Sequence, residues 1–505
     1  MRTAPAFAWG LPFVAKGRIM YPMLSDSWRH SKNKMGVFLM YRKNAWKALA
    51  EGEKAQLDAF AEKYKAYLDA GKTERECVAE SVRQAKAAGF IDLMTAIREG
   101  KRLGAGDRVY CNWMNKCFLA WVIGENDIER GMNILGAHID SPRIDVKQNP
   151  LFENGGFAYL DTHYYGGIKK YQWVASPLAL HGVVCRKDGS TVTIAIGEDG
   201  DDPVFYISDL LVHLAADQMS KPAAKVIEGD ALDIIIGSTP LEGEEKDPVK
   251  AQVLSILKEK YGIEEEDFVS AELEAVPAGK CRDVGFDRAM IVGYGHDDRV
   301  CAYPSMAAVL DFEGTPAYTV CAVLTDKEEI GSVGATGMNA MYFENIMAEL
   351  VANLKGNDSP LSLRRCLANS RMLSSDVSAG YDPNFAGVFE KNNASIVGNG
   401  VTFNKFTGSR GKSGSNDCNA EFVAQVRRIC DEAEVAWQTA ELGKVDVGGG
   451  GTIAYVCAKY GMNVIDCGVP VLSMHAPWET ISKVDLWQEY KCYCAFIKNA
   501  KEFAY

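Results

Sequence analysis

Residues 318–334 read YTVCAVLTDKEEIGSVG, a mainly apolar run that leads to two adjacent carboxylates, Glu328 and Glu329. An apolar run bounded by a glycine-containing turn predicts a buried strand. Two neighbouring carboxylates repel each other, so the pair is unfavourable there without a compensating charge. A metal cation supplies that charge, because one carboxylate can bind it while the other acts as a general base toward a metal-bound water. The stretch therefore predicts a metal site, provided that the chain supplies further ligands.

Four other segments show the same arrangement, a short apolar run followed closely by histidine or aspartate. Read as strands, they place these side chains at carboxyl ends, where the crevice of an open α/β sheet lies. The runs and the residues that follow them are Met132–Ala137 with His138 and Asp140, Ala289–Tyr294 with Asp297 and Asp298, Ser370–Ser375 with Asp376, and Val469–Met474 with His475. We therefore predict an α/β fold with its candidate ligands at strand ends.

The types of ligand favour zinc. Imidazole nitrogens and carboxylate oxygens suit a pair of Zn²⁺ ions, and Co²⁺ or Mn²⁺ are also compatible with this set. A hydrolase that uses two metal ions needs a carboxylate that bridges ions a few Å apart, and an aspartate can fill that position.

Taken alone, each motif has an ordinary structural interpretation. A His-x-Asp motif is more often a hydrogen-bonded pair, an aspartate after serines fits a turn, and a lone histidine in an apolar run is more often a core residue. Some interpretations can hold together: Asp297 can bind a metal while Asp298 caps the following helix, and Asp140 can orient His138. Five strand ends that each carry a ligand type are improbable by chance, and this conjunction favours the metal centre.

The composition excludes several classes of protein. The chain has 505 residues, a net charge of −12, 47% hydrophobic residues and 24% charged residues, which are ordinary values for a soluble globular protein. It has no basic surplus with which to neutralise nucleic-acid phosphates. We find no run of 18 apolar residues, so no membrane-spanning helix is expected. The 14 cysteines contain no CxxC pair, which favours reduced thiols in a cytoplasmic protein.

The sequence pattern predicts four parts. Residues 1–34 are expected to be a loose N-terminal extension or a misassigned start. Residues 35–147 and 291–505 carry strand and helix patterns, as expected for two parts of one α/β catalytic domain. Residues 148–290 instead carry strand-like pieces and turns, with few ligand-type residues in apolar settings. Because this block separates the first histidine from the aspartate pair, we predict that it is an inserted, mainly β domain.

Two glycine-containing stretches raise the question of phosphate binding. Residues 411–413 read GKS, but the phosphate-loop pattern needs glycine at position 406, which is Phe406. Residues 448–451 are four glycines before a predicted helix; they could cradle a phosphate, hold a peptide carboxylate or let a helix approach a metal site. No acidic residue follows at dinucleotide spacing. We expect Gly449 and Gly450 to contact a bound substrate.

Together these residues resemble the aminopeptidase I / aspartyl aminopeptidase family of dinuclear zinc exopeptidases, and the chain is more similar to the aminopeptidase I branch. The resemblance runs from about Asn44 to the C-terminus, and the order and spacing of seven motifs carry it. The motifs are Gly136–Pro142 (GAHIDSP), Tyr165–Gly167, Asp297–Arg299, Glu328–Ser332, Ser374–Asp376, Gly449–Thr452 and Met474–His475.

The resemblance implies a zinc-peptidase catalytic domain with an inserted dimerisation domain, assembled as a homo-oligomeric dodecamer. It also implies that a histidine of the inserted domain stabilises the oxyanion in a neighbouring subunit. The position of His213 after Val204–Ile207 assigns this role to it. The alternative interpretation is that His213 is an ordinary surface histidine. The implied roles are one zinc site completed by His138 and Asp376, a second by Glu329 and His475, Asp297 as the bridge, and Glu328 as the base.

The chain departs from the aspartyl branch of this family in two places. Where that branch carries Trp-Phe-Asp-Arg-Asp-Leu, this chain has Gln172–Leu178, and the position of a basic residue of that branch falls on Phe403. An acidic substrate side chain would be desolvated without a cationic partner, which is unfavourable. We therefore expect a preference for neutral or apolar N-terminal residues, although Lys405 or Lys412 could restore acidic recognition.

The function expected from the sequence is that of a metallo-aminopeptidase acting on peptides with a free N-terminus. One alternative is a related dinuclear zinc amidohydrolase, such as a deacylase or a carboxypeptidase. A second alternative is a catalytically idle shell-forming or cargo-binding protein, although an intact Glu328 and a full ligand set argue against it. Neither nucleic acid nor membrane is an expected partner.

Overall fold

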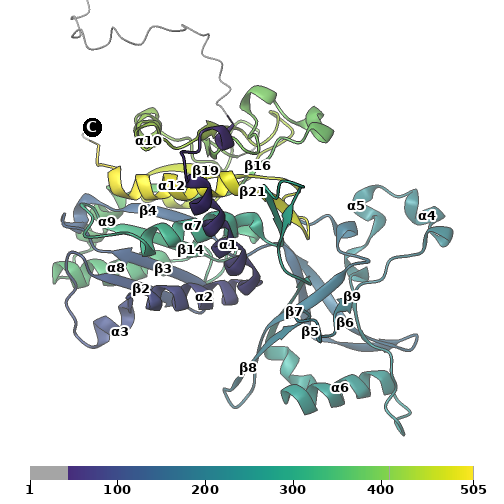
Figure 1. The fold of residues 1–505 in the computed structure, drawn as a ribbon. Helices are drawn as coiled ribbons and strands as arrows, with labels where there is room; N and C mark the ends of the chain where they lie inside the picture. The colour runs from purple at the N-terminus through teal and green to yellow at the C-terminus, as the bar shows by residue number, and fades with distance from the viewer. Residues whose placement is uncertain (1–43, 409, 504–505) are drawn as a thin grey trace, which may run out of the picture. The chain divides into compact units, whose positions relative to one another are not determined.

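The computed structural model describes residues 44–408 and 410–503 (Figure 1). The predicted extension 1–34 lies outside these described residues. A central sheet of nine strands dominates the fold. In spatial order its strands are β1 (Ile91–Asp92), β2 (Arg108–Trp113), β3 (Cys117–Val122), β14 (Val320–Thr325), β4 (Asn133–His138), β15 (Arg371–Ser375), β19 (Asn463–Gly468), β17 (Val401–Asn404) and β18 (Trp437–Thr439).

Parallel pairing in the middle of the central sheet brings distant segments to one edge. Strands β14, β4, β15 and β19 are consecutive parallel neighbours, with Thr325 opposite His138 and Ser374 opposite Asp466. Since parallel strands end at the same edge, the residues after β4, β14 and β15 lie close together there. The predicted α/β fold class is confirmed.

Two of the five predicted strand segments lie outside the central sheet. Strand β13 (Met290–Gly293) pairs with β12 (Arg282–Val284) and β21 (Glu479–Ser482), and β20 (Pro470–Val471) pairs with β16 (Ser378–Ala379). Pro470 has no backbone N–H to donate to a ladder, which disfavours its run in the middle of a sheet. The expected placement of these two segments in one open sheet was therefore wrong. Their ligand-type residues, Asp297 and His475, reach the edge of the central sheet from the small sheets.

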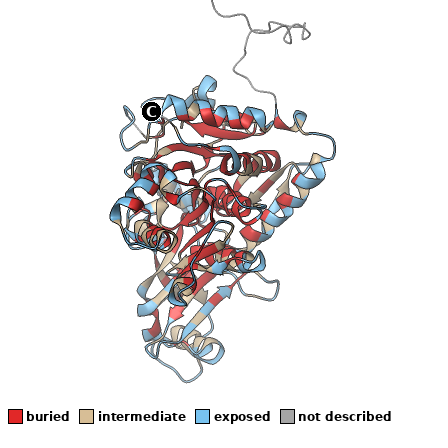
Figure 2. Cartoon of the chain, turned by 90° about the vertical axis from the view of Figure 1, so that its left-hand side faces the viewer, coloured by how far each residue is buried: buried red, intermediate tan, exposed pale blue. Residues whose placement is uncertain are grey.

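Helices cover both faces of the central sheet (Figures 1 and 2). Every residue of β3, β4 and β14 is buried, as expected for strands enclosed on two faces. One face packs against α1 (Glu53–Ala70), α2 (Glu74–Ala87), α7 (His296–Leu310), α10 (Ala420–Glu432) and α12 (Lys483–Asn499). The other packs against α3 (Leu93–Arg98), α8 (Tyr342–Lys355), α9 (Pro360–Ala368) and α11 (Ala454–Ala458). Within the described part of the chain, no helix is long and apolar enough to cross a membrane.

A second sheet of seven strands is built from the middle of the chain and has its own apolar core. Its strands are β11 (Ala271–Pro277), β5 (Arg143–Asn154), β6 (Phe157–Tyr165), β10 (Ile234–Gly237), β9 (Phe205–Tyr206), β7 (Pro177–Cys185) and β8 (Thr191–Ile196). The same region contains α4 (Ala216–Met219), α5 (Ala223–Val226) and α6 (Pro248–Tyr261). Strand β5 begins before the predicted limit at residue 148, and the exact domain limits stay a prediction.

Candidate metal centre

Adjacent parallel strands deliver the first four candidate residues. His138 is the last residue of β4, and Asp376 directly follows β15. Glu328 and Glu329 open the short 3₁₀ helix η8 (Glu328–Ile330) beyond β14. Because β4 lies between β14 and β15, these side chains converge on the same end of the sheet.

Asp297 and His475 reach the same place from the small sheets. Gly295 precedes Asp297 with a φ of 74°, and a Cβ there would lie 2.3 Å from the Arg299 Nη1 atom, so glycine is required. The backbone N–H groups of Asp297 and His475 donate to the two oxygens of Glu479, at 2.9 and 2.6 Å. Glu479 therefore holds these two candidate ligands in a fixed relation to each other.

The candidate ligand atoms surround Asp297. Its Oδ1 atom lies 3.2 Å from His138 Nε2, and its Oδ2 atom lies 3.2 Å from His475 Nε2. His475 Nε2 is also 3.5 Å from Glu329 Oε1, whereas His138 Nε2 is 4.0 Å from Glu328 Oε2. Three groups have ligand atoms within 4.8 Å of one another: His138 with Asp297 and Glu329, His138 with Glu328 and Asp376, and Asp297 with Asp298 and Asp376.

Several buried polar atoms in this cluster lack a hydrogen-bond partner among the described residues. They include His138 Nε2, Asp297 Oδ1, Glu329 Oε1 and both carboxylate oxygens of Asp298. Buried polar atoms without partners are costly, and a divalent cation would satisfy nitrogen and oxygen donors of this kind. The residues therefore fit zinc. Because neither Asp298 oxygen accepts a backbone N–H group of the described residues, the predicted cap of α7 by Asp298 is not formed.

The charges of the cluster are far from balanced without a cation. Burial raises the pKa of Glu328 to about 7, with a further contribution from the negative charges of Asp140 and Asp297. Burial likewise raises the pKa values of Glu329 and Asp376 well above their ordinary range. Burial also acts on Asp297, but the His138 and His475 imidazoles beside its oxygens outweigh it and hold the pKa of Asp297 below its usual value. The pKa of Asp297 thus shifts in the opposite direction to those of Glu328, Glu329 and Asp376.

Asp140 organises the neighbouring groups, as expected from the His-x-Asp motif. Its Oδ1 atom accepts the N–H of Glu328 at 3.1 Å and lies 3.3 Å from His138 Nδ1. Its Oδ2 atom accepts the N–H of Glu329 at 3.2 Å and the Tyr165 hydroxyl at 2.8 Å. The hydrogen bond of His138 Nδ1 goes to the main-chain oxygen of Asp140, at 2.9 Å. Asp140 therefore orients His138 through its backbone, and its buried carboxylate holds the backbone of both glutamates.

A cavity of about 510 Å³ opens onto the cluster. Gly449 and Gly450, two of the predicted substrate-binding residues, line it together with Leu442 and Met474. Glu328, Glu329, Asp297, Asp376 and His475 form the wall on the side of the candidate ligands.

Three other predicted site residues lie away from this cavity. Lys405 and Lys412 do not line it; their ammonium groups lie 3.8 and 2.9 Å from the carboxylate of Asp417. His213 is an exposed residue of the short 3₁₀ helix η5 (Val212–Leu214), near α4 in the region of the second sheet. The roles assigned to these three residues stay predictions.

Two residues of the site were missed by sequence reasoning. Glu479 binds the backbone on both sides of the centre, and an acid four positions after a histidine carries little signal of such a role. Asp466 lies within β19 and lines the cavity, accepts a 2.5 Å hydrogen bond from Thr452, and has its pKa raised to about 7 by burial. Asp466 is followed by Cys467 and Gly468 in the same strand, so the strand-end pattern does not identify it.

Comparison with known proteins agrees with this geometry. The family model described as aminopeptidase I zinc metalloprotease (M18) matches residues 67–497. A probable M18 family aminopeptidase 1 of Clostridium acetobutylicum is 54% identical over 458 residues, which cover 90% of this chain and 98% of that protein. A crystal structure of an M18 family aminopeptidase from Thermotoga maritima has a TM-score of 0.87 at 42% identity and covers 92% of this chain and 100% of its own. The mApe1 dodecamer of S. cerevisiae, at 20% identity and a TM-score of 0.68, shares the fold.

The fold and the cluster define the class of protein: an α/β metallopeptidase with histidine and carboxylate side chains, the candidate ligands, at the ends of its central strands. The chain belongs to the aminopeptidase I (M18) family of zinc metalloproteases. It is therefore a zinc-dependent hydrolase that acts at the N-termini of peptides.

Proposed function

We propose that the chain removes single N-terminal residues with the help of two zinc ions. His138 and Asp376 would hold one ion, Glu329 and His475 the other, and Asp297 would bridge them. The observation that carries this proposal is the position of Asp297, whose two carboxylate oxygens each lie 3.2 Å from a different imidazole. A carboxylate aimed at two separate nitrogens is the arrangement expected of a bridging ligand.

The chemistry of the proposed reaction follows from the remaining groups. When bound, two zinc ions would acidify a shared water and polarise the peptide carbonyl. Glu328 would take the proton of that water and deliver it to the leaving amine, since its side chain lines the cavity beside the candidate ligands. Asp140 holds the Glu328 backbone and His138 in place during the transfer.

The cavity supports the expected preference for neutral or apolar N-terminal residues. Among the described residues that line it there is no lysine or arginine, whereas Val377, Leu442 and Met474 supply apolar surface. An aspartyl side chain would lose its hydration there without gaining an ion pair. Lys405 and Lys412 remain the candidates for any contact with an acidic side chain, and Gly449 and Gly450 for contact with the peptide backbone.

Metal analysis and a substrate panel test this proposal on one preparation. We expect two zinc ions per chain by mass spectrometry, loss of activity after chelation, recovery with Zn²⁺ or with Co²⁺ or Mn²⁺, and faster hydrolysis of leucyl than of aspartyl anilide. One ion per chain would contradict the dinuclear assignment, and a large aspartyl preference would contradict the specificity. Equal hydrolysis of an N-acetylated peptide would instead favour an amidohydrolase.

We further propose that the chain forms homo-oligomers of the dodecameric type and that His213 acts in a neighbouring subunit. The segment around His213 exposes apolar side chains, including Val212 and Leu214 at 74% and 69% exposure, as expected of a surface covered by another subunit. Light scattering tests the assembly. His213→Ala should lower kcat while zinc content and assembly stay unchanged; equal kcat would exclude the role.

A further inference from the structure

Tyr165 connects the second sheet to the candidate metal centre. It is the last residue of β6, and its hydroxyl donates to the Asp140 Oδ2 atom at 2.8 Å. The other contacts of the Asp140 carboxylate come from residues at the edge of the central sheet, namely His138, Glu328 and Glu329. Through this hydroxyl, a side chain of the second sheet thus reaches the carboxylate that organises the centre.

The tyrosine ring is fixed independently of its hydroxyl. Tyr165 lies directly opposite Arg143 in the β5–β6 ladder, and the Arg143 guanidinium carbon lies 3.9 Å from the ring centroid. Arg143 is itself held by Asp145 at 2.8 Å, Glu274 at 3.2 Å and Glu74 at 3.4 Å. A cation over an aromatic face, restrained by three carboxylates, keeps the ring in place.

The hydroxyl matters because Asp140 has no access to solvent. Asp140 is fully buried, so an oxygen that loses a donor has no water to replace it. The Asp140 carboxylate also accepts the backbone N–H groups of Glu328, the proposed base, and of Glu329, a candidate ligand. Loss of the Tyr165 hydroxyl would therefore shift a candidate ligand and the proposed base together.

We propose that Tyr165 is a positioning residue: its hydroxyl holds the Asp140 carboxylate, and through that carboxylate it places Glu329 for zinc binding and Glu328 for proton transfer. This inference rests on the proposed dinuclear function. It adds that the metal centre also depends on a hydroxyl group from the second sheet. Partners that orient metal ligands at one remove typically change metal affinity or activity by about 10–100-fold when they are lost.

Tyr165→Phe tests the proposal because it removes the hydroxyl and keeps the ring on Arg143. Tyr164→Phe is the matched control, since Tyr164 is the adjacent residue, is 40% exposed and packs beside the His163 ring. Zinc affinity is measured on chelated protein by competition with a fluorescent zinc indicator, and kcat and KM are measured at saturating zinc. We expect Tyr165→Phe to bind zinc about tenfold more weakly and to lower kcat about tenfold with little change in KM, while Tyr164→Phe matches the wild type.

The outcomes distinguish a failure of the Tyr165 inference from a failure of the proposed function. Equal zinc affinity and kcat in the two variants would overturn the role of Tyr165. A lower melting temperature for Tyr165→Phe with unchanged zinc affinity and kcat would also overturn it, because the hydroxyl would then only stabilise the fold. If the wild type binds zinc but cleaves no N-terminal residue, the proposed function fails, while the difference in zinc affinity between the variants still reports on Tyr165.

Discussion

Buried carboxylates have different partners in two regions of the molecule: the candidate metal centre, and the cluster of charges where α2 meets the second sheet. The second group, here called the junction cluster, comprises Glu74, Glu76, Lys116, Arg143, His181, Glu198 and Glu274. In the junction cluster the fully buried Glu74 has Lys116 at 2.7 Å and Arg143 at 3.4 Å. In the candidate metal centre the buried Glu329 side chain has the His475 imidazole at 3.5 Å and the His138 imidazole within 4.8 Å, and no lysine or arginine of the described residues forms an ion pair with it.

The pKa directions express this difference. Burial raises the pKa of Glu74, but the charges of Arg143 and Lys116 outweigh burial and hold that pKa below its ordinary range. For Glu329 burial prevails, and repulsion by Asp297 adds to it, so its pKa lies well above the ordinary range. The junction cluster is complete as the chain folds, whereas the metal centre needs cations from outside.

The largest effect is expected at the centre itself. Glu328→Gln removes the proposed base with almost no change in shape, so kcat should fall by about 10²–10⁴-fold while zinc content is retained. Glu329→Gln is the contrasting variant, because it removes a proposed ligand and should lower zinc content by mass spectrometry. Retained activity in Glu328→Gln would contradict the role of Glu328 as the base and would favour a different base.

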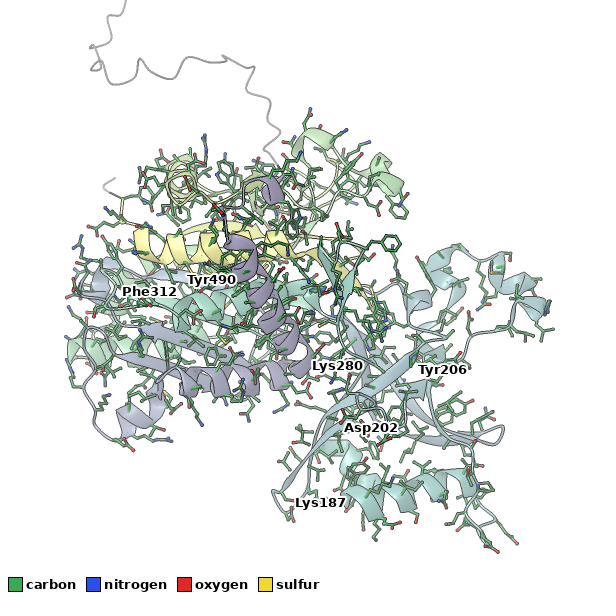
Figure 3. The ribbon with its side chains drawn as sticks, in the orientation of Figure 1. Lys187, Asp202, Tyr206, Lys280, Phe312 and Tyr490 are labelled. Carbon is green, nitrogen blue, oxygen red and sulfur yellow. The ribbon has the colours of Figure 1, made fainter. Side chains whose placement is uncertain are left out.

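Removing a cation from the junction cluster should affect stability rather than chemistry. Lys116→Met leaves Glu74 with Arg143 alone, and breaking a buried ion pair in this way typically costs about 3–5 kcal/mol of unfolding free energy. Urea denaturation with purified protein measures the change. Lys187→Met is the control: Lys187 lies at the tip of the β7–β8 hairpin, 2.6 Å from Glu266 on the surface, and its loss should leave the midpoint unchanged (Figure 3). Equal midpoints for the two variants would show that the junction cluster is not required for stability.

The pH dependence of stability should sharpen the same contrast. Burial lowers the pKa of His181, but Glu198 and Glu76 outweigh it and raise that pKa to about 9. In the unfolded chain a histidine has a pKa of about 6.5, so the folded protein binds the extra proton between these values. The stabilisation is complete below about pH 6.5 and is lost as the pH rises through about 9, by about 3 kcal/mol. His181→Gln should flatten the unfolding free energy measured from pH 6.5 to 9.5; an unchanged slope would exclude His181 as its source.

The smallest effect is expected at the two lysines outside the cavity. The double variant Lys405→Ala, Lys412→Ala should lower aspartyl anilide hydrolysis by about threefold at low salt and leave leucyl hydrolysis unchanged, because exposed charges act weakly across solvent. The kcat/KM ratio for the two anilides is the measurement. A tenfold or greater loss of aspartyl hydrolysis would place a lysine in direct contact with the substrate side chain.

Particular residues show how far the sequence predicts the site. His138, Glu328, Glu329 and Asp376 follow apolar runs that form parallel strands, and their meeting at one edge follows from strand direction alone. Asp466 lies inside β19 rather than after it, so this signal does not extend to Asp466. Glu479 could not have been found in this way, because its role is to accept backbone N–H groups from segments that only the fold brings together.

The sequence by itself determined the α/β class, the family motifs and the candidate ligands, because burial and strand alternation leave a periodic pattern that is local to each segment. Only the tertiary structure decided that Asp297 faces a different histidine with each oxygen, and that Tyr165 of the second sheet reaches Asp140. Contacts of this kind join residues far apart along the chain. Their geometry depends on the packing of whole sheets and loops, for which a single sequence contains no local signal.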